Sequence, residues 1–352
     1  MRLGYHTGYW SAGPPSGALE AVLEAERLGF DSVWTAEAYG SDAFTPLAWW
    51  GARTHAIRLG TAIAQLSART PTATAMAALT LDHLSGGRFV LGLGVSGPQV
   101  VEGWYGQPYP RPLARTREYV AIVRDVLARQ APVTFDGEFY QLPLRGGSGL
   151  GKALRSTVHP LRADLPIHLA AEGPRNIALA AEIADGWLPL FYSPRMDGAY
   201  RELLADGFAR RGAAGTRPPR DEAEFEGSAT VPVVVDDDVE RAADAVRPFI
   251  ALYAGGMGAP GANFHRDVLV RLGYGEACDE IAAHYLAGRR AEATAAVPIE
   301  LVEEIALVGP PEKIRAELVA WQRTAVTTMV VQGDARALAV VAAALTAGLA
   351  PA

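Results

Sequence analysis

The chain of 352 residues is 49% hydrophobic and 20% charged, with a formal net charge of −7. This composition excludes an intrinsically disordered chain and allows a large buried core without covalent staples. The acidic balance provides no basic surface for nucleic acid, so we expect no nucleic-acid partner.

Strand and helix patterns alternate from the first residues onward. The helix predicted at 17–30 ends at Gly29, and the helix predicted at 69–87 is capped by Thr70 and ends at Gly86, as the usual start and stop signals require. The predicted strands are 2–6, 31–37, 57–66, 88–95, 166–171, 185–191, 225–235 and 327–333. The other predicted helices are 45–54, 114–130, 174–184, 198–212 and 334–348. Eight strands that alternate with helices imply a parallel sheet and favour a closed (β/α)8 TIM barrel.

Three segments of this expected single domain, residues 1–352, depart from the repeat. The first, 98–113, holds four prolines and is predicted as an ordered loop. The second, 131–165, contains a candidate hairpin, "VTFDGEFYQL", and a glycine-rich run, and the third, 255–297, is glycine-rich and then helical. Long loops in compact domains are often lids or binding loops, so we expect all three over the carboxyl-terminal mouth of the barrel.

A G-x-G-x-x-G spacing follows the predicted strand at 88–95, formed by Gly92, Gly94 and Gly97. A dinucleotide-binding turn needs a helix directly after these glycines, whereas Pro98 and a proline-rich loop follow here. We therefore reject a Rossmann site. Gly92 and Gly94 are expected to let the strand approach a neighbouring strand or a flat ligand closely.

Neither a disulfide nor a membrane segment is indicated. Cys278 is the only cysteine, so no intramolecular disulfide or thiolate metal cluster forms. The beginning "MRLGYHTGYW" lacks the apolar stretch of a signal peptide, and the longest apolar runs are too short and alanine-rich to span a bilayer. We expect a cytoplasmic protein with no membrane partner.

Three stretches together resemble a known family: "GFDSVWTAEAYGSDAFTPLAWWG", "RLGTAIAQLSARTPTATAMAALTLDHLSGGRFVLGLGVSGPQVVEGWYG" and "AEGPRNIALAAEIADGWLP". In their order and spacing they are similar to the luciferase-like monooxygenase superfamily, in its actinobacterial branch of F420-dependent oxidoreductases. The resemblance implies a barrel that binds coenzyme F420, or FMN in sister branches, with the flat ring in the mouth. It also implies a homo-oligomer, since relatives commonly pair through barrel helices.

The resemblance assigns roles to several residues near the ring. Glu37 matches an acidic residue beside the deazaflavin, although Ala38 stands where several relatives have histidine. Ala62 and Ile63 match a bulge with a non-prolyl cis peptide that backs the ring. Gly97 stands where related glucose-6-phosphate dehydrogenases use glutamate, so their sugar-phosphate chemistry is not carried over.

Other ring and phosphate contacts are expected at the strand exits. Gly94, Val95 and Ser96 end the predicted strand 88–95, at the rim where barrel enzymes keep their chemistry. The best phosphate cradle is "AEGPRN", in which four residues are expected to offer free backbone N–H groups at a helix start, with the Arg175 charge in addition. These four are Glu172, Gly173, Arg175 and Asn176. The alternative is an ordinary helix start.

Candidate side-chain roles each have a structural alternative. Gln65 is placed to hydrogen-bond the pyrimidine edge of the ring, and Arg69 either meets an anion or caps a loop. His6 ends the first strand and is a candidate for proton transfer, or it is a satisfied core histidine. Glu37 is a candidate acid or base, or the partner of a nearby arginine in a structural salt bridge.

Outside these stretches the signals are weaker. His265 either reaches the pocket from the third segment or is a solvated loop histidine. The run Asp236–Asp238 is better explained as a helix start than as a metal site. Trp10 and Tyr39 are expected to wall the pocket, and the pair Trp49–Trp50 is expected in the core.

The predicted function is an oxidoreductase that transfers a hydride between coenzyme F420 and a small organic substrate. The cofactor carries the electrons, and the protein supplies orientation, a dry pocket and a proton donor. An activated C=C, a C=O or an alcohol fits this chemistry equally well. The alternatives are an FMN-dependent monooxygenase using O2, a non-catalytic F420 or flavin carrier, and a barrel enzyme without redox function.

Overall fold

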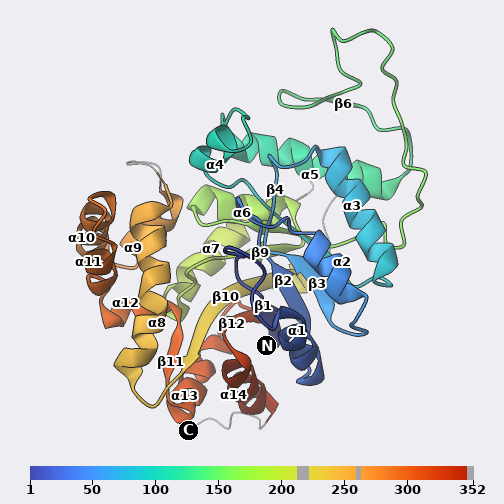
Figure 1. The fold of residues 1–352 in the computed structure, drawn as a ribbon. Coiled ribbons are helices and arrows are strands. Elements are labelled where there is room, and N and C mark those ends of the chain that lie inside the picture. Colours follow the sequence, from blue (N-terminus) through green and yellow to red (C-terminus); the bar gives the residue numbers. More distant parts are fainter. Residues whose placement is uncertain (212–221, 259–262, 347–352) are drawn as a thin grey trace.

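A closed ring of eight parallel strands forms the centre of the molecule (Figure 1). The structure is a computed structural model, and it describes residues 1–211, 222–258 and 263–346. The ring consists of β1 (Arg2–His6), β2 (Ser32–Thr35), β3 (Arg58–Thr61), β5 (Phe89–Gly94), β8 (Ile167–Ala170), β9 (Gly186–Leu188), β10 (Glu226–Val235) and β12 (Thr328–Gln332). Each strand pairs with the next and β12 pairs with β1, which closes the barrel. The predicted TIM barrel is confirmed.

The predicted strand 57–66 is divided in two. After β3, a cis peptide joins Ala62 to Ile63, and β4 (Ala64–Gln65) resumes the pairing with β5. Gly60 pairs with Val90 and Ala64 pairs with Leu93, so the β3–β4 side carries one residue more than the β5 side. An extra residue of this kind is a bulge, as the resemblance implied for this position.

Helices surround the barrel in the alternating order that the sequence predicts. They are α1 (Ala18–Arg27), α2 (Thr45–Gly51), α3 (Pro71–Leu84), α5 (Pro112–Ala128), α6 (Pro174–Ile183), α7 (Asp197–Phe208), α8 (Val239–Ala251), α13 (Pro311–Trp321) and α14 (Ala335–Thr346). Only the start of α8 was predicted, from the acidic run 236–238, without its extent. Neither α13 nor β11 (Leu307–Gly309), which extends the sheet beside the end of β10, was predicted. Asp238 caps α8 by accepting from the N–H groups of Glu240 and Arg241, which confirms the helix-start interpretation of the acidic run. Residue 212 and residues 347–348 of predicted helices lie outside the described part.

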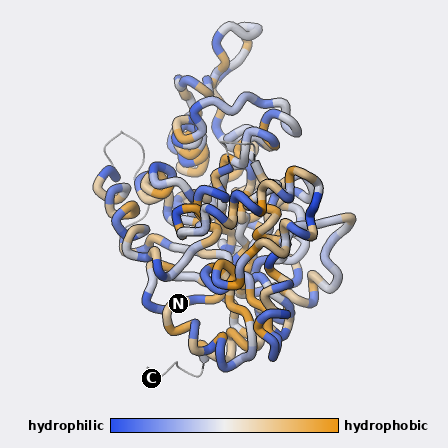
Figure 2. Tube along the Cα trace, turned by 90° about the vertical axis from the view of Figure 1, so that its left-hand side faces the viewer, coloured by the Kyte–Doolittle hydropathy of each residue, from blue (hydrophilic) through white to orange (hydrophobic). Residues whose placement is uncertain are grey.

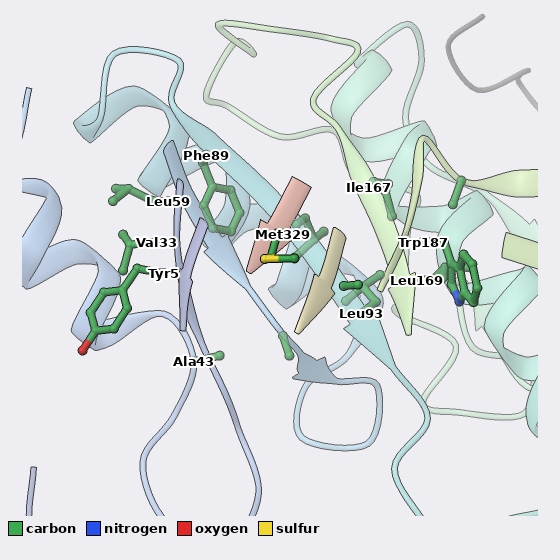
Figure 3. Close-up of a cluster of buried hydrophobic side chains, with 14 of the residues drawn as sticks. Tyr5, Val33, Ala43, Leu59, Phe89, Leu93, Ile167, Leu169, Trp187 and Met329 are labelled. Carbon is green, nitrogen blue, oxygen red and sulfur yellow. The ribbon is translucent and has the colours of Figure 1, made fainter. Parts of the chain in front are cut away.

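Alternate side chains of the strands pack on opposite faces of the barrel wall. Val33, Leu59 and Phe89 belong to the main core between strands and helices, which Figure 3 shows in close-up. Trp34 and Val90 are the next residues along β2 and β5, and they belong to a separate small cluster. This alternation follows from the two-residue period of a strand. Figure 2 shows hydrophobic segments concentrated in the middle of the molecule.

The first and third insertions reach the mouth of the barrel. Residues 98–113 are not a loop throughout, because α4 (Pro98–Gly103) begins directly after Gly97. The closed barrel nevertheless excludes a Rossmann sheet. The third insertion holds α9 (Phe264–Arg271), α10 (Gly275–Leu286) and α11 (Arg290–Ala295), and α12 (Ile299–Ile305) follows it. These helices pack with α8 around a hydrophobic cluster of their own, and residues 259–262 lie outside the described part.

The second insertion was wrongly expected over the mouth. The predicted hairpin is present as β6 (Phe135–Asp136) and β7 (Gln141–Leu142), but it extends away from the barrel (Figure 1). Its turn is tied to the outer surface of α5, where the Glu118 carboxylate accepts the N–H groups of Glu138, Phe139 and Tyr140. Among the described residues, no helix is long and apolar enough to cross a membrane.

Candidate active site

A cavity of about 1270 Å³ opens at the carboxyl-terminal ends of the barrel strands. All twelve residues that the sequence analysis placed in the site line it: His6, Glu37, Ala62, Ile63, Gln65, Gly94, Val95, Ser96, Glu172, Gly173, Arg175 and Asn176. Tyr39 lines the cavity as expected, but Trp10 is not among the lining residues. Of the tryptophan pair expected in the core, Trp50 is buried but Trp49 is 60% exposed. The volume exceeds that of most single-ligand sites, so it has room for a large cofactor and a substrate.

One wall of the cavity is apolar and made from neighbouring strands. Ala62 and Ile63 of the bulge and Ala170 of β8 pack on the small cluster that contains Trp34. Gly94 makes the close approach possible, because a Cβ atom there would lie 2.7 Å from Ile63 Cδ1. The resulting surface offers a planar ring a packing face without polar side chains.

The carboxylate of Glu37 is fully engaged at the edge of this wall. Its side chain is 4% exposed, and Arg69 Nη1 lies 2.8 Å from Oε1 and 2.9 Å from Oε2. The backbone N–H of Gln65 donates to Oε2 at 2.9 Å. This geometry favours the salt-bridge interpretation of Glu37. Arg69 is the partner in this salt bridge, and it does not line the cavity.

Gln65 presents an acceptor that lacks a partner. Its Nε2 donates to the carbonyl oxygens of Glu37 at 2.9 Å and Ala38 at 3.2 Å. Two carbonyl partners identify this atom as the nitrogen, so the other terminal atom is the oxygen. That Oε1 is buried and has no hydrogen-bond partner among the described residues. A buried orphan acceptor is costly, and a ring N–H in the cavity would satisfy it.

His6 faces the cavity as a neutral imidazole. Its side chain is buried, and Nδ1 accepts the backbone N–H of Gly8 at 3.0 Å. Burial lowers the pKa of His6 to about 4, although a backbone hydrogen bond at Ala62 opposes this shift. The ring therefore carries its single proton on Nε2 at neutral pH.

The phosphate cradle is narrower than predicted. Asn176 does not offer a free backbone N–H, because that group donates to the Gly173 carbonyl oxygen at 2.9 Å. Gly173 caps α6 without a side chain and Pro174 has no N–H, so the available backbone N–H groups at the helix start are those of Gly173 and Arg175. Arg175 is exposed and makes no ion pair within the described residues. The helix start and this free guanidinium can together hold an anion.

The wall contributed by the end of α8 and the residues that follow it was missed. Phe249, Tyr253 and Met257 line the cavity, and their four-residue spacing would have placed them on one helical face. Tyr253 Oη lies 3.1 Å from Tyr9 Oη. Burial, with the nearby Tyr9 and Glu172, raises the pKa of Tyr253 well above its usual value.

His265 also lines the cavity, so the interpretation as a solvated loop histidine is wrong. Its Nδ1 lies 2.7 Å from Oε1 of Glu172. Within the described residues, Glu172 Oε2 is buried without a partner. The carboxylate of Glu172 therefore binds the histidine, and only its backbone is available for the predicted phosphate cradle.

Two side-chain contacts hold the loop that carries α4 at the rim of the cavity. Ser96 adopts a left-handed backbone conformation with φ 58°, and its carbonyl oxygen accepts the Tyr109 hydroxyl at 2.9 Å. Arg111 forms an ion pair with Glu138. These contacts hold the first insertion at the rim, where Trp104 and Tyr109 line the cavity.

Comparison with known proteins gives a consistent result. The family model described as luciferase-like monooxygenase matches residues 3–328. A protein of Mycobacterium tuberculosis, provisionally named a coenzyme F420-dependent oxidoreductase, is 59% identical over 333 residues, which is 94% of each chain. Among solved structures, the coenzyme F420-dependent tetrahydromethanopterin reductase of Methanopyrus kandleri matches with a TM-score of 0.78 at 23% identity, over 97% of each chain. An F420-dependent secondary alcohol dehydrogenase matches with a TM-score of 0.76 at 17% identity, over 98% of each chain.

Proposed function

Because this chain belongs to the luciferase-like monooxygenase family, we propose that it is a coenzyme F420-dependent oxidoreductase that acts on a small organic substrate. The 59% identity to a relative of that provisional name supports the choice of cofactor. A cytoplasmic location and the absence of a nucleic-acid partner, as expected from composition, belong to the same proposal.

The observation that carries the proposal is the unpartnered Oε1 of Gln65 beside the apolar wall. A planar ring against Ala62, Ile63 and Gly94 would place a ring N–H within reach of this buried acceptor. The anionic tail would meet Gly173 and Arg175 at the start of α6. The residues present thus fit both the flat and the charged part of the cofactor.

The chemistry supplied by the bound cofactor is hydride transfer to or from a carbon atom of the substrate. The protein orients the two partners and excludes water between the apolar wall and the α4 loop. Glu37 and His6, the predicted catalytic residues, lie at this wall. In the proposal Glu37 positions Gln65 through its backbone N–H, and neutral His6 supports the bulge at Ala62.

Titration with coenzyme F420 and with FMN, followed by fluorescence, tests the proposal. We expect tighter binding of F420, and about tenfold weaker binding in Arg175→Ala because the anion loses its cationic partner. Arg315→Ala is the matched control, since Arg315 is equally exposed on α13 and lies outside the cavity. The affinity of Arg315→Ala for F420 should equal that of the wild type.

The alternatives give different results in the same experiment. Tighter binding of FMN than of F420 would support the monooxygenase. Tight F420 binding without turnover on a panel of ketones, enones and alcohols would support a carrier. Affinity for neither ring would support a barrel enzyme without redox function.

We also propose a homo-oligomer, formed through helices α2 and α3 and the second insertion. Trp49, Met76 and Leu84 on these helices are 60%, 60% and 73% exposed, and Leu150 in the insertion is 86% exposed. Large apolar side chains this exposed are the ones an interface would cover. We expect a dimer by light scattering and a monomer for Leu84→Glu, whereas Leu286→Glu on α10, where the leucine is 69% exposed, should remain dimeric. A monomeric wild type would contradict this proposal.

A further inference from the structure

The groups at the ring wall are poorly placed to exchange a proton with a substrate. Both carboxylate oxygens of Glu37 accept from Arg69 in a nearly closed environment. Nδ1 of His6 is occupied by the Gly8 N–H, and the ring also forms a hydrogen bond with the Ala62 backbone. A reaction that moves a hydride to a carbonyl carbon still requires a proton at the oxygen, so another group of the cavity must supply it.

The opposite side of the cavity holds such a group. His265 on α9 and Glu172 before α6 are 93 residues apart in the chain, and their side chains meet at 2.7 Å. Both side chains line the cavity. A carboxylate only accepts, so the imidazole proton lies on Nδ1, between the two groups.

This pairing leaves Nε2 of His265 free. Within the described part of the chain, Nε2 has no hydrogen-bond partner, and it is not among the buried orphan atoms. The imidazole is held edge to face by Tyr253, with ring centroids 4.7 Å apart, and by Phe191 at 6.5 Å. A fixed imidazole with a carboxylate on one nitrogen and an open position on the other is the usual arrangement of an acid–base histidine.

The surroundings of the pair are well defined. Arg271 Nη2 donates to the Glu172 carbonyl oxygen at 2.7 Å, which fixes the carboxylate's backbone. Tyr253, hydrogen-bonded to Tyr9, is the other titratable group facing the imidazole. Arg266, on the same helix as His265, is paired with Asp279 and so does not compete for Glu172.

Charge pairing also restricts the substrate. Among the described lining residues, Glu37 is paired with Arg69, Arg111 with Glu138, and Glu172 with His265. Arg175 alone has no ion-pair partner, and the proposed function assigns it to the cofactor tail. The aromatic rings of Tyr253 and Phe191 pack on the imidazole. The cavity lining also includes the apolar side chains of Phe249, Met257 and Phe264. This end of the cavity therefore suits an uncharged substrate.

We propose that His265 and Glu172 are the acid–base pair for an uncharged carbonyl compound or the corresponding alcohol; the assignment rests on the proposed function. In reduction, a hydride supplied by the proposed F420 cofactor would form the new C–H bond, the π electrons of the C=O would move to oxygen, and the oxygen would take the proton from Nε2 of protonated His265. His265 ends neutral, and Glu172 stays ionised and holds the ring. In oxidation, the hydroxyl proton passes to Nε2 as the hydride leaves.

The first test needs no cofactor. Diethyl pyrocarbonate modifies accessible, unprotonated imidazole nitrogens, and peptide mass spectrometry locates the product. We expect His265 to react about as fast as His284, a surface histidine beside Glu280. Glu172→Ala should slow the reaction of His265 several-fold, because the ring loses its orienting partner, and leave His284 unchanged. A His265 that does not react while His284 does would overturn the proposal.

The second test uses the F420-loaded enzyme with cyclohexanone and cyclohexanol as neutral probes and pyruvate as a charged one. We expect His265→Asn to lower kcat by roughly 100- to 1000-fold while F420 affinity stays unchanged. Glu172→Gln should lower kcat by a smaller factor than His265→Asn does. It should change the pH dependence of kcat and leave KM unchanged. His284→Gln is the matched control and should behave as the wild type.

The outcomes separate the two proposals. F420 binding with undiminished kcat in His265→Asn would overturn the acid–base pair and leave the proposed function standing. Absence of F420 binding in the wild type would overturn the proposed function itself. A preference for pyruvate over cyclohexanone would overturn the uncharged substrate class.

Discussion

The Gly92→Ala variant is expected to lose about 3 to 5 kcal/mol of unfolding free energy. A Cβ atom at Gly92 would overlap the carbonyl oxygen of Thr61, and it would lie 2.8 Å from Leu188 Cδ1. The two strands are joined at this point, since Thr61 Oγ1 accepts the Gly92 N–H at 2.9 Å and donates to the Gly92 carbonyl oxygen at 2.7 Å. Backbone cannot move aside as a flexible side chain can, so β3 must separate from β5.

The same substitution is expected to weaken F420 binding. Thr61 directly precedes Ala62 and Ile63, so a displaced β3 carries the apolar wall with it. Urea unfolding followed by circular dichroism, and F420 titration below the transition, measure the two effects.

Gly103→Ala is the control for this prediction. Gly103 lies in α4, and a Cβ atom there would meet nothing within 4 Å. Alanine in a helix is favoured over glycine by up to about 1 kcal/mol, so this variant should be as stable as the wild type or slightly more stable. Equal stability of Gly92→Ala and wild type would show that β3 and β5 are not in contact as described.

Stability is expected to fall by about 3 kcal/mol for each of two buried histidines as the pH is lowered toward 4. Burial lowers the pKa of His6 and of His168 to about 4, from an ordinary value of 6.5. For His168 the neighbouring Glu226 opposes the shift and Arg58 adds to it, with smaller effects of Asp185 and Arg2. The unfolded chain binds these protons more tightly than the folded barrel. Their contribution is therefore complete above about pH 6.5 and is lost between that pH and 4.

Urea unfolding between about pH 7.5 and 4.5 measures this loss, and His168→Leu isolates one of the two groups. In the part of the chain that the structure describes, both ring nitrogens of His168 lack hydrogen-bond partners, so an apolar side chain of similar size should be tolerated at neutral pH. We expect the variant to lose less stability on acidification than the wild type. His55→Gln, at an exposed position, should leave the pH dependence unchanged. An unchanged slope in His168→Leu would contradict the assignment.

The repeating part of the fold was predictable because its signals are local. Each of the eight predicted strands is present, from Arg2–His6 to Thr328–Gln332, with ends that differ by a few residues. Two-residue alternation, a proline at a helix start and a glycine at its end are read within ten residues of chain. That the barrel forms one domain stays a prediction.

Insertions were less predictable, because a loop's sequence does not say where the loop goes. The hairpin at 131–165 was recognised, yet its direction depends on Glu118, which lies on α5 and binds the hairpin's turn. Helix α13 and strand β11 were missed, and of α8 only the start was predicted, where the chain departs from a simple repeat. The position of β11 depends on its pairing with β10, and α8 and α13 both pack against it, which no local pattern records.

For the site, the strand pattern and the family resemblance together were enough to place twelve residues at one rim, because the carboxyl ends of parallel strands in a closed barrel meet at the same end. The resemblance was also enough to identify the bulge at Ala62 and Ile63. Tertiary contacts decide which of these residues keep atoms free for a ligand. Arg69 binds the Glu37 carboxylate, the Gly8 N–H binds Nδ1 of His6, and Oε1 of Gln65 has no partner among the described residues. The pairing of Glu172 with His265 exists only in the folded chain, because an interaction across 93 residues leaves no periodic trace in either segment.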